Sequence, residues 1–328
     1  MQMPGEALLI KMWETLIEKG IGGLIVPYYV IWKNRKLALS KIELDKQCRI
    51  ATSKAEQEIA QITSSETKLI GYETLPSEEN ASEVSIKNII NNDVKRLIRE
   101  EINVAKAINY ANERLIEDFS ETPKDEINQD WLNTWRDNAS KVSNEEVQSL
   151  WGNVLAQEFL EPGRYSLRLL EFLRTMSKSD ALLIEKIAPF ISNDRIIYKR
   201  EKSNNNLFNS FNIMKSELSF LEEIGIIFGV SAGGMVATAN NLNEEKLGFL
   251  AAITIDENTT IAISSSERDK VVKYGLYEMT KIGSEVLSLI GIGISSDYVA
   301  WLGNQFVEDF KVEIFKKIDD KYELEKTL

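Results

Sequence analysis

The stretch from residue 85 to residue 119 constrains the fold more than any other part of the chain. Its apolar residues recur at three- and four-residue spacing, which is the repeat of one face of an α-helix. They are Ile86, Ile89, Ile90, Val94, Leu97, Ile98, Ile102, Ala105 and Ile108. A helix with so long an apolar stripe needs other elements to cover it. Because the 328-residue chain has only six prolines, further long helices are expected as partners.

Residues 27–64 are the expected partner of this helix. The segment is rich in Lys, Glu, Ala, Gln and Leu and has neither Gly nor Pro after Pro27, a composition typical of helices. Residues 71–84 contain Pro76 and clustered Ser, Glu and Asn, which indicates a linker. We therefore expect an antiparallel helical hairpin whose exposed ends are natural surfaces for contacts between copies of the chain.

Residues 129–190 predict a compact helical cluster. Ser143, with a Glu three residues later, has the pattern of a capping box, and Ser179 is the predicted cap of a helix over residues 180–190. Three tryptophans, at positions 131, 135 and 151, are expected to anchor the packing of this cluster.

A distinctive motif lies inside this cluster: a helix face with Trp and Glu, then a Pro-Gly turn, then Ser-x-Arg. Its residues are Trp151, Ala156, Glu158, Pro162, Gly163, Ser166, Arg168 and Leu170. The motif resembles that of the bacterial domain-of-unknown-function 2806 family and of the related abortive-infection alpha (Abi-alpha) type. The resemblance covers residues 128–300 and, more loosely, residues 1–40. It implies a role in anti-phage defence, as an effector, sensor or scaffold, with no assigned reaction.

Two motif residues, Glu158 and Arg168, carry opposite charges on neighbouring helices across the Pro-Gly turn. We expect a buried or half-buried ion pair that fixes the turn. Replacing either residue with Ala should then lower stability by roughly 1–3 kcal/mol, because the other charge is left uncompensated. The alternative is that Glu158, Arg164 and Arg168 form the rim of a ligand or partner site.

Residues 193–328 predict a winged-helix-like α+β part. A helix ends in Ile-Gly-Ile-Ile at residues 224–227, strand-like segments follow, and Met279-Thr280 leads into a further helix. A helix over residues 298–317 is expected to close this part. Winged helices commonly bind DNA, but residues 206–295 carry six basic and eleven acidic side chains, and DNA affinity depends on cationic contacts to phosphates. An interaction module is therefore favoured over the alternative, a DNA-binding regulator.

The chain has no histidine and one cysteine, Cys48. Its own residues therefore cannot form a Ser-His-Asp triad, a Cys-His dyad, an intrachain disulfide or a His- or Cys-rich metal site. We expect no cofactor and no metal.

One segment has the sequence pattern of a catalytic motif. Residues 229–233, Gly-Val-Ser-Ala-Gly, match the spacing of a nucleophile elbow. Their sequence resembles the motif of the patatin-like lipases, and this resemblance would make Ser231 the nucleophile of a Ser-Asp dyad. The oxyanion loop and the Asp-Gly partner of those enzymes are missing. A glycine-rich turn is therefore the favoured interpretation, and a patatin-like serine hydrolase is the alternative.

The N-terminal region is basic and apolar. Residues 1–54 carry nine Lys or Arg and five acidic residues, although the whole chain has a net charge of −12. Residues 5–18 predict a short amphipathic helix, and residues 20–32 form an uncharged run. As a helix this run would reach only about 20 Å, short of the roughly 30 Å hydrocarbon core of a membrane. It predicts either an assembly contact or a peripheral contact with an anionic membrane surface. The residues expected to make this contact are Ile25, Tyr29, Trp32, Lys33, Arg35 and Lys36.

Together these patterns predict a mainly α fold, with a long helical hairpin, a helical core and a small winged-helix-like α+β C-terminal part. The expected divisions are an N-terminal segment (1–70), a linker (71–84), a long helix with the family core (85–192), and the winged-helix-like domain with its closing helix (193–328). The expected function is a non-enzymatic component of bacterial anti-phage defence that acts by homo-oligomeric assembly and by contact with protein or membrane. Expected partners are further copies of the chain, a protein of a defence system and an anionic membrane surface, but not nucleic acid. The expected location is the cytoplasm, peripherally at the inner membrane.

Overall fold

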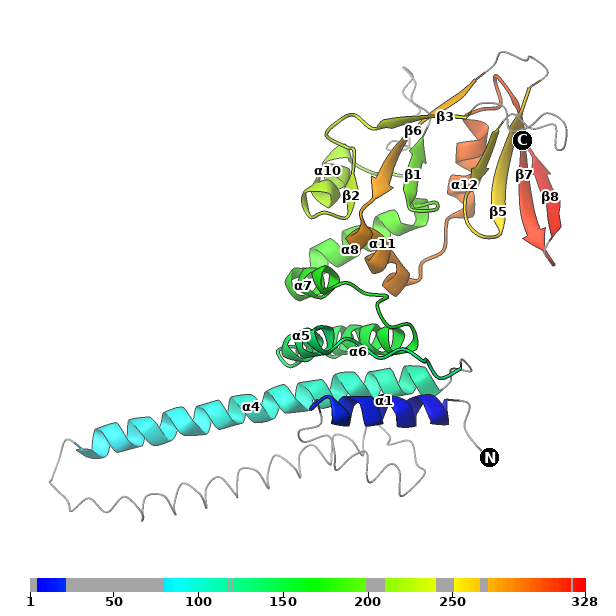
Figure 1. Ribbon diagram of the computed structural model, residues 1–328. Helices are drawn as coiled ribbons and strands as arrows, with labels where there is room; N and C mark the ends of the chain where they lie inside the picture. The colour runs from blue at the N-terminus through cyan, green and yellow to red at the C-terminus, as the bar shows by residue number, and fades with distance from the viewer. Residues whose placement is uncertain are drawn as a thin grey trace. The chain divides into compact units, whose positions relative to one another are not determined.

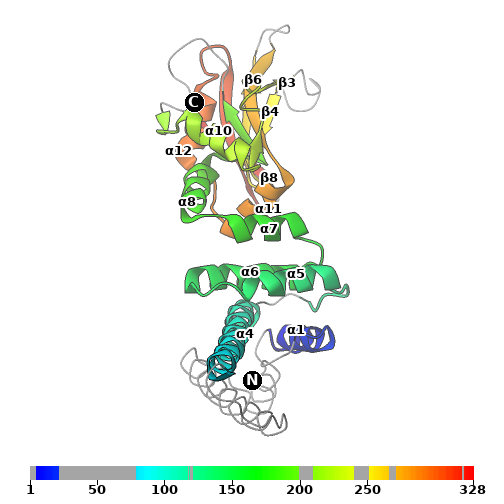
Figure 2. The same cartoon turned by 90° about the vertical axis from the view of Figure 1, so that its left-hand side faces the viewer.

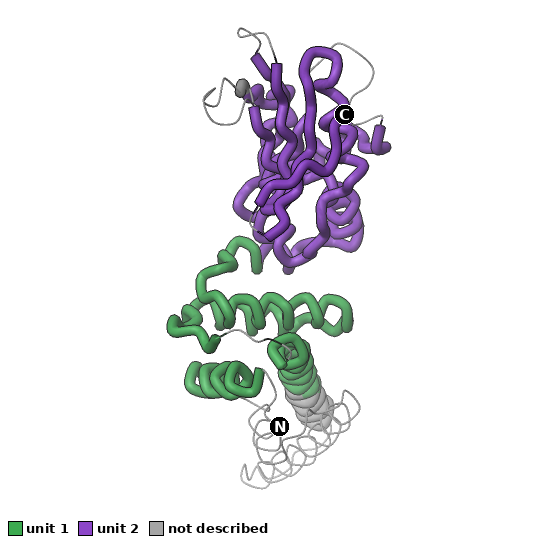
Figure 3. The backbone as a smooth tube through the Cα atoms, turned by 90° about the vertical axis from the view of Figure 1, so that its right-hand side faces the viewer, with its two compact units in different colours: residues 1–170 green, residues 171–328 purple. Residues whose placement is uncertain are grey.

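The computed structural model is shown from two sides in Figures 1 and 2, and Figure 3 colours its two compact units, residues 1–170 and 171–328. The structure describes residues 5–21, 79–116, 118, 121–198, 210–239, 251–265, 271–319 and 321–328. The expected helix over residues 27–64, Cys48 and the six expected contact residues of the N-terminal run lie outside the described residues.

The described part of unit 1 is helical. Its helices are α1 (Glu6–Glu18), α4 (Glu79–Ile116), α5 (Gln129–Ala139), α6 (Glu145–Leu160) and the start of α7 (Leu167–Thr175). The short helix expected over residues 5–18 is confirmed as α1. The long helix expected from residue 85 is confirmed as α4, which begins six residues earlier, at Glu79.

The core of unit 1 forms where α1 and α6 pack on the C-terminal part of α4. The apolar face of α1 is buried, with Met12 at its centre 0% exposed, and Gly5 donates its N–H to the carbonyl of Ile116 at 3.1 Å. Figure 2 shows α6 running across α4. A Cβ added to Gly152 would lie 2.6 Å from the carbonyl oxygen of Ala107, so only glycine allows the two helices to approach this closely.

Unit 2 combines helices with two antiparallel sheets. Its helices are α8 (Lys178–Ile187), the 3-10 helix η2 (Ala188–Phe190), α10 (Lys215–Glu223), α11 (Lys281–Ile290) and α12 (Ser296–Asn304). One sheet has β6 (Val272–Met279) at its centre, with β1 (Arg195–Tyr198) on one side and both β2 (Ile227–Phe228) and β3 (Met235–Ala239) on the other. The second sheet has the order β4 (Ala251–Thr254), β5 (Thr259–Ser264), β7 (Lys311–Ile318) and β8 (Lys321–Thr327).

These two four-stranded sheets correct the expected fold class. A mainly α chain with a small winged-helix-like end was predicted, but strands make up much of unit 2, and the fold is a helical unit followed by an α+β unit. The predicted closing helix over residues 298–317 is wrong, because α12 ends at Asn304 and β7 follows. Burial at the start of β7 explains this: Val312 and Ile314 are buried, whereas Lys311 is exposed and Glu313, between them, is only partly buried, which is the two-residue period of a strand.

Helix α12 lies between the two sheets. Its Tyr298 is fully buried, and the hydroxyl accepts the N–H of Ile197 in β1 at 3.0 Å and donates to the carbonyl of the same residue at 2.9 Å. Burial raises the pKa of Tyr298 well above its ordinary value, so the hydroxyl keeps the proton that it donates. On its other side α12 packs against β7 of the second sheet.

Candidate functional site

The Pro-Gly turn of the motif is held by the carboxylate of Glu158. This side chain, in the last turn of α6, is 1% exposed and accepts the backbone N–H groups of Gly163 at 2.7 Å and Tyr165 at 2.8 Å. The N–H of Arg164 donates to the carbonyl of Glu161 at 3.0 Å, and Gly163 has a φ of 89°, a conformation that favours glycine. Glu158 is therefore the internal acceptor that fixes the connection between α6 and α7.

The other motif residues lie in different environments. Trp151 is buried in α6, and its carbonyl accepts the indole N–H of Trp135 at 2.9 Å. The hydroxyl of Ser166 accepts the N–H three residues later at 3.2 Å, at the start of α7. Arg168 is exposed, so of the two charges it is Glu158 that is buried. The expected ion pair of Glu158 with Arg168, and the alternative ligand rim, stay predictions.

The Gly-x-Ser-x-Gly segment forms the turn between β2 and β3. The carboxylate of Glu222, near the end of α10, accepts three successive backbone N–H groups, from Gly229 at 2.8 Å, Val230 at 2.9 Å and Ser231 at 2.8 Å. Burial acts to raise the pKa of Glu222, but the hydrogen bonds from the turn outweigh it and leave the pKa below its ordinary value. Sequence reasoning missed Glu222, whose only signal is an acid shortly before a glycine-rich run.

This geometry does not support a nucleophile at Ser231. A nucleophile elbow joins a strand to a helix. Here the segment with Ser231 joins β2 to strand β3 and not to a helix. The structure favours the glycine-rich turn, and the hydrolase alternative loses the support of its motif.

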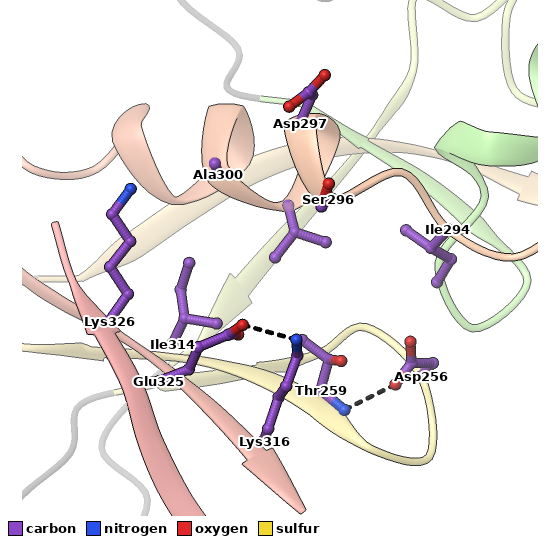
Figure 4. Close-up of a pocket in the computed structure, with 11 residues that line it drawn as sticks. Asp256, Thr259, Ile294, Ser296, Asp297, Ala300, Ile314, Lys316, Glu325 and Lys326 are labelled. Atoms are coloured by element: carbon purple, nitrogen blue, oxygen red, sulfur yellow. Dashed lines mark hydrogen bonds and ion pairs between the residues drawn. The ribbon is translucent and has the colours of Figure 1, made fainter.

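A pocket of about 530 Å³ lies between α12 and the second sheet of unit 2, as Figure 4 shows. Ile294, Val299 and Ile314 give it an apolar part, and charged side chains of β7 and β8 line another part. These residues come from separate segments of the sequence. No motif could have shown them together, which is why sequence reasoning missed this pocket.

The described residues lack two further kinds of functional feature. No group of Cys, Asp and Glu side chains in the described ranges is arranged to hold a metal ion. None of the described helices combines the length and the apolar character that a membrane crossing requires.

The chain matches the model of a known protein family. The family model described as "Protein of unknown function (DUF2806)" matches residues 90–303, which include α5, α6, the Pro-Gly turn and much of unit 2. No curated protein and no solved structure matches the chain significantly.

Proposed function

The chain belongs to the DUF2806 family, a family of unknown function, and from that premise we propose that it is a non-enzymatic component of bacterial anti-phage defence that assembles with further copies of itself through α4. The defence role rests on the resemblance of the Trp-Glu-Pro-Gly motif to the Abi-alpha type. The non-enzymatic part of the proposal is supported by the turn at Ser231, which leads into strand β3 and not into the helix of a nucleophile elbow.

The observation that carries the assembly proposal is the N-terminal part of α4. The helix has 38 residues, about 57 Å at 1.5 Å per residue, yet among the described side chains burial begins only at Ile98. Every described side chain of α4 before Ile98 is exposed, including Leu97 at 53%. Figure 1 shows this part of α4 extending past α1, α5 and α6.

In the sequence, the apolar stripe continues toward the start of α4 beyond the exposed Leu97. A stripe that long gains free energy when a matching surface removes it from water, at about 25 cal/mol per Å² of apolar area. The same stripe on a second copy is such a surface, and two helices with this spacing pack as a coiled coil. Self-association through α4 is therefore the assembly that we propose.

The test is the molar mass in solution, measured by light scattering at micromolar concentration. We expect the wild-type protein at a multiple of 37.3 kDa and Leu97→Glu at a lower mass, because a carboxylate on the stripe opposes burial. Lys95→Gln is the matched control: it changes the charge by the same amount at an exposed position off the stripe. A monomeric wild-type protein, or an equal loss of mass in both variants, contradicts the assembly proposal.

The defence role has a separate readout, the plating efficiency of phage on cells that express each variant. We expect protection by the wild-type protein and by Lys95→Gln, and its loss with Leu97→Glu. If the wild-type protein assembles but protects against no phage of a broad panel, the defence role is wrong and the assembly proposal stands.

The basic N-terminal run contributes a second contact in this proposal, with an anionic membrane surface. Each basic residue near such a surface contributes about 1 kcal/mol, so replacing Lys33, Arg35 and Lys36 with Gln should release the protein from anionic vesicles. The measurement is flotation with vesicles, with neutral vesicles as the control. If the wild-type protein never floats, but making Ile25 and Tyr29 polar lowers its mass in solution, the run is an assembly contact instead.

A further inference from the structure

An irregularity in β8 directs two consecutive charged residues into the pocket of Figure 4. Phe315 of β7 pairs with Leu324, and the preceding residue, Ile314, pairs with Lys326, so Glu325 is left without a partner in the register. Neighbours on a regular strand point to opposite faces. Glu325 and Lys326 nevertheless both line the pocket, as expected of a β-bulge, which redirects side chains.

Only one of these two charges is neutralised. The carboxylate of Glu325 pairs with the ammonium group of Lys316 at 2.6 Å, and the two form one wall of the pocket. The ammonium group of Lys326, an exposed residue, makes no hydrogen bond or ion pair within the described part of the chain, and Figure 4 shows the side chain rising from β8 toward α12. The bulge therefore supplies the pocket with one uncompensated positive charge.

The two remaining acids at the pocket do not compensate Lys326. Asp256 accepts the backbone N–H groups of Asn258 at 2.8 Å and Thr259 at 2.7 Å, which commits its carboxylate to the turn between β4 and β5. Asp297 lies in the first turn of α12, and in Figure 4 its carboxylate points away from the sheet. Neither forms an ion pair with Lys326 in the residues that the structure describes.

The middle of the pocket is apolar. Val299 from α12, Ile314 from β7 and Ile294 from the loop before α12 line this space between helix and sheet, and Figure 4 shows Ile294 and Ile314 there. Its volume of about 530 Å³ is within the range of small-molecule sites, about 300–1,000 Å³. A pocket with an apolar part and one unpaired cation at its edge matches a ligand with a short apolar body and one negative charge.

We propose that this pocket binds a small carboxylate with an aliphatic body, which packs against Val299 and Ile314 while its carboxylate pairs with Lys326. One cation matches a monoanion better than a phosphate monoester, which carries nearly two charges at neutral pH. The site lies wholly in unit 2 and uses no residue of α4, so it goes beyond the proposed assembly and its test is independent of it.

The test is calorimetric titration of the full chain with hexanoate, and with hexanol as an uncharged probe of similar body. We expect saturable binding of hexanoate and weaker binding of hexanol. Lys326→Gln should weaken hexanoate binding about tenfold, the effect of losing one charge-assisted contact at a partly solvated site. Lys321→Gln is the matched control, because it removes an exposed lysine of the same strand that does not line the pocket.

A second variant tests the apolar part. Ala300 of α12 lines the pocket, and Ala300→Trp should fill it and abolish hexanoate binding in a protein whose thermal melt shows that it is folded. If this variant does not fold, the two lysine variants decide. No saturable binding of hexanoate at millimolar concentration, equal affinity for hexanol, or equal weakening by Lys326→Gln and Lys321→Gln overturns the proposal.

Discussion

The turn after α6 and the turn after β2 are both held by a carboxylate that accepts backbone N–H groups, but the two carboxylates differ in their access to water. Glu158 is 1% exposed and accepts two N–H groups, whereas Glu222 is half-buried and accepts three. Each carboxylate stands before a turn that contains glycine at positive φ. Each turn also lies in a stretch of sequence that suggests a function. The turn after α6 does so by its charged residues, and the turn after β2 does so by its Gly-x-Ser-x-Gly pattern.

This difference in burial shows why the number of hydrogen bonds does not tell which carboxylate stabilises the protein more. When Glu158 is removed, water cannot readily reach the N–H of Tyr165, which is buried, and an unsatisfied buried donor costs about 1–3 kcal/mol. Glu222 is itself only half-buried, so when it is removed water can enter its place and replace it at the exposed Ser231 and the half-buried Gly229, although Val230 is buried. Burial, and not the number of bonds, should therefore decide how much each carboxylate stabilises the protein.

The largest effect is expected from Glu158→Ala, which should lower the free energy of unfolding by about 3 kcal/mol, because the buried N–H of Tyr165 loses its acceptor at a site that water cannot readily reach. Glu158→Gln keeps one acceptor oxygen and should lose less. Urea unfolding measures both, and Glu161→Ala, at an exposed neighbour, is the control. A melt of Glu158→Ala identical to wild type, together with lost function, would place Glu158 in a binding site instead.

The next largest effect is expected in the turn of Glu222, from Gly234→Ala. Gly234 has a φ of 85°, and an added Cβ would lie 1.8 Å from the hydroxyl oxygen of Tyr198. The combined strain and overpacking should lower stability by about 2 kcal/mol. Adding Tyr198→Phe removes the obstructing oxygen, so the double variant should recover part of the loss. Equal stability of Gly234→Ala and wild type would show that the turn is not packed on Tyr198.

Glu222 itself should contribute less, and its contribution should depend on pH. Its pKa is lowered in the folded protein, because the hydrogen bonds from the turn outweigh the opposing effect of burial. A lowered folded pKa means that the stabilisation is complete above the unfolded pKa of about 4.3 and is lost as the pH falls through the folded value. The stability difference between wild type and Glu222→Gln should therefore shrink as the pH is lowered below about 4.3. A difference that grows on acidification contradicts this assignment.

The sequence predicts features that depend on residues close together in the chain better than features that depend on contacts between distant residues. The stripe of α4 and the break at the Pro-Gly turn were predictable, because helical spacing and turn chemistry are local. The cap of α6 was predicted one residue too early, at Ser143 where Asn144 is the cap. The cap of α8 was predicted two residues too late, at Ser179 where Ser177 is the cap. Several neighbouring side chains can cap a helix, and packing decides which one does.

Other features depend on contacts between distant residues and have no local signal. The alternation of buried and exposed residues in β7 was not recognised, because the aromatic residues in and before it have a spacing that also suits a helix. The segment is a strand that pairs with β5 and β8. The pocket exists only because α12 packs on the second sheet, and its free charge exists only because β8 has a bulge. Glu222 and Ser231 are nine residues apart, yet no helical or strand period links them, because their contact crosses β2.

A smaller effect is expected from Arg168→Ala. The prediction of a buried pair implies that Arg168→Ala and Glu158→Ala lower stability equally. Arg168 is exposed, however, and exposed ion pairs contribute little to stability. We now expect a change of about 0.5 kcal/mol or less in the free energy of unfolding. A double-variant cycle with Glu158→Ala measures any coupling between the two, and a coupling above about 1 kcal/mol would restore the ion pair as the device that fixes the turn.

The smallest effect is expected from Ser231→Ala. The substitution removes a hydroxyl that is not needed for catalysis in this proposal and keeps the backbone N–H that donates to Glu222 at 2.8 Å. Stability should change by less than about 0.5 kcal/mol, and protection against phage should equal that of the wild-type protein. Ser231→Pro provides the contrast, because proline has no N–H and removes one of the three donors, so it should destabilise the turn where Ser231→Ala does not. If Ser231→Ala folds normally but abolishes protection, Ser231 acts through its hydroxyl and the turn has a chemical role that its hydrogen bonds do not reveal.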